Sequence, residues 1–161
     1  MRWSKLKQLV ENNFADAVKP HLSIHSTAYG ACTCGHAWIT FDKEIIANFC
    51  TRAYYNRYQY GDKTTDNGIN AEQAKNYSSQ FVEYGEMSRQ DCYESCWSFV
   101  HDLSFDKAMK SDNPLIQSLM VVDKRLGKRR IDNIDSSKLH PLANKLLEIR
   151  KNAEAKQWIH K

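Results

Sequence analysis

The chain has 161 residues, of which 42% are hydrophobic and 26% are charged, and its formal net charge is +4. These values are typical of globular proteins and exclude collagen-like, fibrous and intrinsically disordered chains. A chain of this length can bury a hydrophobic core without disulfide bonds. We therefore expect a single domain over residues 1–161.

Membrane and secretory classes are also disfavoured. No apolar run approaches the roughly 20 residues that a membrane-spanning helix needs, and the N-terminal segment lacks the apolar stretch of a signal peptide. The five cysteines, an odd number, favour free thiols in a reducing compartment over a disulfide framework. We expect a cytoplasmic protein without membrane contact.

The first part of the chain predicts one helix and then a small antiparallel sheet. Apolar residues recur at helical spacing over residues 3–18, and Pro20 restricts the residue before it and ends this helix. Three runs have the alternation or β-branched and aromatic content of strands, and the last two flank a hairpin turn. These runs are residues 22–27, 37–41 and 45–50, with 54–60 as a candidate fourth strand. Trp38 and Phe49 are expected on buried faces of this sheet.

Helical patterns dominate after an exposed loop that we expect at residues 61–70. Asn113-Pro114 is the clearest helix start, because asparagine caps free N–H groups and proline fits the first helical position. We expect Gly127 to end that helix in a left-handed conformation. The other predicted helices cover residues 71–86, begin after Ser88 and Ser104, and run from Pro141 to Trp158.

This order of elements predicts an α+β fold. A small antiparallel sheet of three to four strands follows an N-terminal helix and packs against a C-terminal set of helices.

Two segments have the composition of a binding surface. Residues 101–161 carry 13 Lys and Arg against 8 Asp and Glu, and five of these cations lie within seven residues, at Lys124, Arg125, Lys128, Arg129 and Arg130. Such a cluster can bind phosphates or carboxylates. It can equally complement the negative end of the preceding helix or remain solvated.

The second segment interleaves tyrosine and arginine, at Arg52, Tyr54, Tyr55, Arg57, Tyr58 and Tyr60. Of these, Arg52, Tyr54, Arg57 and Tyr58 are the candidate partner-binding residues. Tyrosine and arginine are enriched at protein interfaces. The same composition can stack on nucleic acid bases, or simply cover a sheet edge.

The histidines and cysteines give weaker indications. Cys32, Cys34 and His36 lie within five residues, but the one-residue spacing of the first pair is poor for a structural zinc site. We therefore assign no metal and no cofactor. Cys92 and Cys96 are expected in the core as small hydrophobic residues.

No phosphate loop, nucleophile elbow or zinc-protease motif occurs, so no catalytic residue is assigned. An enzyme would use a site around His25, Cys32, His36 and Asp42.

Several segments resemble one protein family. They are residues 1–7, 24–27, 37–40, 46–50, 111–116 and 123–130. In this order they are similar to a family of small uncharacterised bacterial proteins typified by a Shigella hypothetical protein, over about residues 1–131. The resemblance implies a bacterial cytosolic origin and no particular activity. In that family's pattern the segment before the second strand lacks Cys32 and Cys34, which further disfavours zinc.

The leading functional hypothesis is a non-catalytic binding or regulatory protein that engages another macromolecule, in the first place a protein. Nucleic-acid binding is the alternative, and an enzyme with a His/Cys/Asp site is the third. Oligomeric state is left open.

Overall fold

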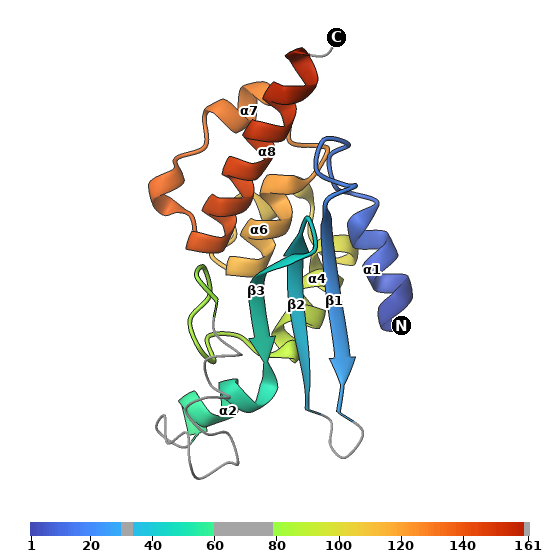
Figure 1. Ribbon diagram of the computed structural model, residues 1–161, viewed down its shortest axis with the longest axis vertical. Helices are drawn as coiled ribbons and strands as arrows, with labels where there is room; N and C mark the ends of the chain where they lie inside the picture. The colour runs from blue at the N-terminus through green and yellow to red at the C-terminus, as the bar shows by residue number, and fades with distance from the viewer. Residues whose placement is uncertain (30–33, 60–78, 160–161) are drawn as a thin grey trace. The chain divides into compact units, whose positions relative to one another are not determined.

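The computed structural model describes residues 1–29, 34–59 and 79–159 (Figure 1). One helix, a three-stranded antiparallel sheet and a series of helices follow each other along the chain, which confirms the predicted α+β class. The strands are β1 (Leu22–Ala28), β2 (Gly35–Phe41) and β3 (Glu44–Cys50). The helices are α1 (Trp3–Glu11), α2 (Thr51–Gln59), α4 (Arg89–His101), α5 (Phe105–Ala108), α6 (Pro114–Val122), α7 (Lys128–Asp132) and α8 (Pro141–Ile159), with a short 3₁₀ helix, η1 (Ser136–Lys138).

The chain forms two compact units. The first contains residues 1–22 and 95–161, and the second contains residues 23–94. The helical unit holds α1 and α5 to α8, the sheet unit holds α2 and nearly all of the sheet, and α4 runs from one unit into the other. Within the described residues, no helix has the length and apolar character needed to span a membrane.

The sheet has the order β1-β2-β3, with β2 antiparallel to β3 (Figure 1). Ala37 lies opposite Phe49, and all three strands contribute buried apolar side chains to this face. Trp38 pairs with Asn48 and, because side chains alternate along a strand, lies on the other face. Phe49 is buried as predicted, but the prediction for Trp38 is wrong, because its side chain is half-buried.

The β2–β3 hairpin closes through a two-residue turn. Asp42 and Lys43 both have positive φ angles, 49° and 70°. Positive φ at both central residues is the geometry of a type I′ turn, which matches the twist of antiparallel strands. The predicted hairpin is therefore confirmed, although neither residue is the glycine that this turn prefers.

Helix starts follow the local sequence closely. Ser88 Oγ accepts a hydrogen bond from Asp91 N at 3.1 Å, and Asp91 Oδ2 accepts one from Ser88 N at 2.7 Å, so the two residues form a reciprocal cap for α4. Asn113 Oδ1 accepts from the N–H groups of Leu115 and Ile116 and caps α6, whose first residue is Pro114. The predicted starts at Ser88, Ser104, Asn113 and Pro141 are confirmed.

Helix α1 ends at Glu11, so the prediction of a helix to residue 18 is wrong. The peptide groups that follow bond to a distant segment instead of continuing the helix. Ala15 N donates to Val122 O and Lys124 N donates to Asn13 O, both at 2.8 Å, and Phe14 forms an isolated bridge with Asp123. These long-range bonds satisfy backbone groups that a longer helix would have used.

Two further predictions are corrected. Residues 54–59 do not form a fourth strand but belong to α2. Residues 79–86 are not helical; they form turns, the first of which is closed by a bridge between Ser79 and Val82. The predicted loop at 61–70 and the first part of the predicted helix, residues 71–78, lie outside the described residues.

Helix α6 is the core of the helical unit. All eight residues from Leu115 to Val122 are buried, and α6 runs beside α8 (Figure 1). The chain after α6 is held by Arg150 of α8, which is 3% exposed. Its guanidinium donates to the carbonyl oxygens of Val121, Asp123 and Leu126 at 3.1, 2.6 and 2.6 Å, and to Glu154 at 2.9 Å.

Candidate functional site

The interleaved tyrosines and arginines form one exposed face of α2. Tyr58 is 57% exposed and Tyr55 is 39% exposed, and both belong to the few large hydrophobic side chains that are exposed in the described structure. Tyr54 is half-buried, and its ring centroid lies 4.7 Å from that of Tyr58 and 6.1 Å from that of Tyr55. We define the α2 patch as Arg52, Tyr54, Tyr55 and Tyr58.

The opposite face of α2 is anchored within the sheet unit. Ala53 and Asn56 are fully buried. Asn56 Nδ2 donates to the Tyr84 hydroxyl at 3.3 Å, and Gly85 lies against the carbonyl oxygen of Ala53. The buried Thr51 donates its hydroxyl proton to Gln90 Oε1 at 2.6 Å. The tyrosine rings are therefore presented by a helix that is fixed from behind.

The two arginines of this segment have different roles. Arg57 Nη2 forms an ion pair with Glu83 at 2.8 Å, and Nη1 donates to the Tyr84 carbonyl at 3.1 Å. The hydrogen bond that Arg57 donates to Glu83 is the main reason why the pKa of Arg57 is raised. Arg57 thus attaches α2 to residues 83–84. Arg52 is exposed, and its guanidinium carbon lies 5.2 Å above the Tyr29 ring, within reach of a cation–π interaction.

A stack of three rings lies on the Trp38 face of the sheet. The Trp38 ring is stacked with His25 at 5.1 Å and with His36 at 5.0 Å between centroids. His25 Nε2 lies 2.9 Å from Thr40 Oγ1, and His36 Nε2 lies 2.7 Å from Asn48 Oδ1. Burial lowers the pKa of His36, partly offset by the hydrogen bond with Asn48. Thr40 and Asn48, each on the strand next to its histidine, therefore hold the two histidine rings in place.

The lowered pKa makes stability depend on pH. The unfolded chain binds more protons than the folded chain between the lowered pKa of His36 and about 6.5, the ordinary histidine value. The contribution of His36 is fully present above that interval and is lost as the pH falls through it. We expect the urea midpoint of the wild type to fall more between pH 7.5 and pH 5 than that of His36→Gln. The other histidines are common to both proteins, so equal pH dependence would contradict this assignment.

The residues of the enzyme and zinc hypotheses are only partly brought together. His25 and His36 both stack on the Trp38 ring and lie on the same face of the sheet. Asp42, in contrast, is exposed in the hairpin turn. Cys32 lies outside the described residues, and Cys34 is a half-buried free thiol. Among the residues that the structure describes, no three His, Cys, Asp or Glu side chains gather in a way that could hold a metal ion.

The other described cysteines are buried free thiols. Cys92 and Cys96 lie in the core as predicted. Burial raises the pKa of Cys50, outweighing hydrogen bonds from the start of α2 that lower it. A raised pKa keeps the thiol protonated and poorly nucleophilic.

The structure separates the five cations of residues 124–130 into two groups, one in the loop after α6 and one in α7. Helix α6 ends at Val122, and Gly127 has φ −72° and precedes α7, so the prediction that Gly127 ends a helix in a left-handed conformation is wrong. Lys124 donates to the carbonyl oxygen of Asn12 at 2.9 Å. Arg125 binds the fully buried carboxylate of Asp123 through Nε and Nη2 at 2.9 and 2.7 Å, which raises the pKa of Arg125. Both cations serve to hold the loop after α6.

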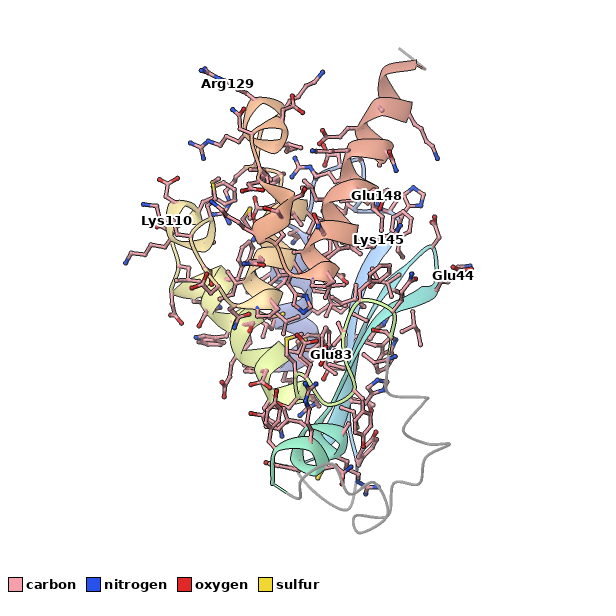
Figure 2. All side chains as sticks on the ribbon, turned by 90° about the vertical axis from the view of Figure 1, so that its left-hand side faces the viewer. Glu44, Glu83, Lys110, Arg129, Lys145 and Glu148 are labelled. Atoms are coloured by element: carbon pink, nitrogen blue, oxygen red, sulfur yellow. The ribbon has the colours of Figure 1, made fainter. Side chains whose placement is uncertain are left out.

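The other three cations begin α7. Lys128, Arg129 and Arg130 are exposed, and Figure 2 shows Arg129 extending away from its helix. Arg130 forms a long ion pair of 3.6 Å with Asp106. Arg129 and Arg130 fall in the last turn of this five-residue helix. The three cations follow the end of α6 by six to eight residues, so they are not at the helix end where the sequence analysis placed them.

Comparison with known proteins identifies a family for this chain. The profile of the SF0329 protein family matches residues 2–151. The chain belongs to the SF0329 protein family. No curated protein matches it, and no solved structure does.

For this SF0329 family member, the match continues beyond residue 131, where the resemblance of the quoted segments ended, and extends into α8. The sheet, the α2 patch and the cations of α7 all lie within the matched residues. Tyr55, the second most exposed ring of α2, lies in the predicted tyrosine- and arginine-rich segment but not among its predicted binding residues. In a strand at 54–60 its side chain would face away from those of Tyr54 and Tyr58. A helical reading puts residues 55 and 58 on one face, since they are three apart.

Proposed function

We propose that this SF0329 family member is a non-catalytic binding protein of the bacterial cytoplasm that engages another protein through the α2 patch. The observation that supports this proposal is the exposure of Tyr55 and Tyr58 on one rigidly anchored helix face. Large aromatic rings that are exposed to water mark sites where a partner can bury them. Tyrosine and arginine are also enriched among the hot-spot residues of protein interfaces.

The chemistry of the patch favours a protein over a nucleic acid. Arg57 is engaged with Glu83 and Arg52 lies over the Tyr29 ring, so the patch combines few charges with three phenol rings. A nucleic-acid surface relies on several cations that neutralise backbone phosphates. Aromatic rings with few charges suit the desolvated centre of a protein interface.

The test begins with the isolation of a binding partner from host extract by crosslinking and the purification of that protein. Its affinity is then measured by calorimetry against the wild type and against the double variant Tyr55→Ala, Tyr58→Ala. We expect at least roughly thirtyfold weaker binding, since one hot-spot residue contributes about 2 kcal/mol or more. The thermal midpoint should change little, because both rings are exposed.

The matched control is the double variant Lys128→Ala, Arg129→Ala, which removes two exposed cations from α7. Under the proposal it binds the partner within about threefold of the wild type, the small effect expected of peripheral charges. If the α7 variant lost binding and the tyrosine variant kept it, the assignment to the α2 patch would be wrong. Binding to RNA or DNA that weakens steeply with added salt would instead support the nucleic-acid alternative.

A further inference from the structure

The helical unit contains an open cavity of about 730 Å³. It lies between residues 106–112, α6, Arg130 of α7 and residues 133–139. Met109, Met120, Ile134 and Leu139 supply its apolar lining. This volume is within the range of small-molecule sites, which combine an apolar lining with a few polar groups.

The walls of the cavity are held in place by hydrogen bonds. Gln117 of α6 is buried, and its Nε2 donates to the carbonyl oxygen of Ser111 at 3.0 Å while its Oε1 accepts from His140 N at 2.9 Å. One side chain thus connects the segments on both sides of α6. On the far wall, Asp135 Oδ1 accepts from Ser137 N and Oγ at 3.1 and 2.6 Å, and these bonds lower the pKa of Asp135. The cavity is therefore largely formed before a ligand arrives.

Charges of both signs surround the apolar lining. Arg130 and Asp106 are paired at 3.6 Å, and so are Lys138 and Asp135. Within the described part of the chain, Lys110 and Asp112 make no hydrogen bond or ion pair through their side chains, and both are exposed. Figure 2 shows Lys110 projecting from the surface. The rim therefore offers one unpartnered cation and one unpartnered carboxylate.

We infer that this cavity binds a short apolar peptide with free ends. The apolar side chains of such a peptide would cover the methionines, Ile134 and Leu139, its carboxylate would pair with Lys110 and its ammonium group with Asp112. Methionine side chains adapt to apolar groups of different shape. The carboxylates of the lining oppose phosphates and nucleic acids, and the cations oppose purely cationic ligands, so a ligand with one charge of each sign fits best. This inference does not depend on the α2 patch.

The test is an NMR titration of the full-length protein with the tripeptide Leu-Ala-Leu. The side-chain amide signals of Gln117 and Asn133 are the reporters, because both residues line the cavity. We expect saturable shifts of both signals with the free-ended tripeptide. The same tripeptide with acetylated and amidated ends should bind at least tenfold more weakly, because it carries neither end charge.

Variants locate the charges. Lys110→Ala and Asp112→Ala should each weaken binding of the free-ended tripeptide several-fold and leave the blocked tripeptide unaffected. Neither should disturb folding, since both side chains are exposed and unpartnered in the described structure. Lys151→Ala, which removes an exposed lysine of α8 away from the cavity, is the matched control and should bind like the wild type.

Several results would overturn the inference. They are an absence of saturable shifts at millimolar tripeptide, equal affinity for the free and the blocked tripeptide, and equal affinity for free leucine and the tripeptide. Shifts of the same two signals with an RNA oligomer but not with the tripeptide would also overturn it.

Discussion

Replacing Arg150 with methionine is expected to lower the free energy of unfolding by about 3–5 kcal/mol, the range for breaking a buried charged network from one side. Methionine can fill much of the same space, but it donates no hydrogen bond. The carbonyl groups of Val121, Asp123 and Leu126 would then lose the donor that they share, and buried carbonyl groups without partners are expensive. Urea denaturation measures the change.

Two control variants isolate this effect. Arg150→Lys keeps the charge but replaces the planar guanidinium with a single ammonium group, which cannot match the fork of donors, so we expect an intermediate loss. Arg129→Met makes the same chemical change at an exposed site of α7 and should alter stability by no more than about 0.5 kcal/mol. An Arg150→Met protein within 1 kcal/mol of the wild type would show that the network contributes little.

Replacing Gly85 with alanine is expected to destabilise the protein by about 2–5 kcal/mol, for two reasons that act together. Gly85 has φ +66°, where an alanine is strained by about 1–2 kcal/mol. Its new Cβ atom would also collide with the carbonyl group of Ala53 in α2, and overpacking typically costs 1–3 kcal/mol. The collision would push α2 away from the segment that anchors it.

Gly127→Ala is the matched control for this substitution. Gly127 has φ −72°, and an added Cβ atom would meet no atom within 4 Å. Alanine is compatible with this conformation and restricts the unfolded chain, but glycine is preferred at the position that precedes a helix, so the two effects oppose each other and stability should change by less than about 1 kcal/mol. Thermal denaturation of both variants gives the comparison. Equal midpoints for the two would mean that the close approach of Gly85 to α2 is readily relieved.

The elements that sequence predicted well are those decided by neighbouring residues. The start of α4 is fixed by hydrogen bonds between Ser88 and Asp91, which are three residues apart. The start of α6 is fixed by Asn113, which caps the helix just before Pro114. The end of α1 is different. Its position at Glu11 depends on backbone hydrogen bonds between residues 13–15 and 122–124. A local sequence pattern cannot predict a hydrogen-bond partner that lies more than a hundred residues away.

The α2 segment was ambiguous for another reason. Tyrosine and arginine are acceptable in both strands and helices, so composition did not decide between them. The buried side of α2 consists of the small Ala53 and the polar Asn56, which do not form a recognisable apolar stripe. Their burial depends on residues 83–85, which the sequence assigned to a helix.

The burial of Arg150 could have been predicted from its spacing along the helix. It lies four residues after Leu146 and eight after Leu142, both buried, so it occupies the apolar face of α8. A charged residue at such a position needs several hydrogen-bond partners if it is to be buried. The partners themselves, three carbonyl groups after α6, could not be identified without the fold.

Helix α2 begins at the residue immediately after the last residue of β3, so no linker separates the α2 patch from the sheet. Cys50 is the register partner of His36, whose ring lies on Trp38. Because no flexible joint lies between α2 and β3, a rotation of the first turn of α2 is expected to move Cys50 and its register partner His36. The fluorescence of Trp38, which stacks on His36, is therefore expected to change when α2 moves.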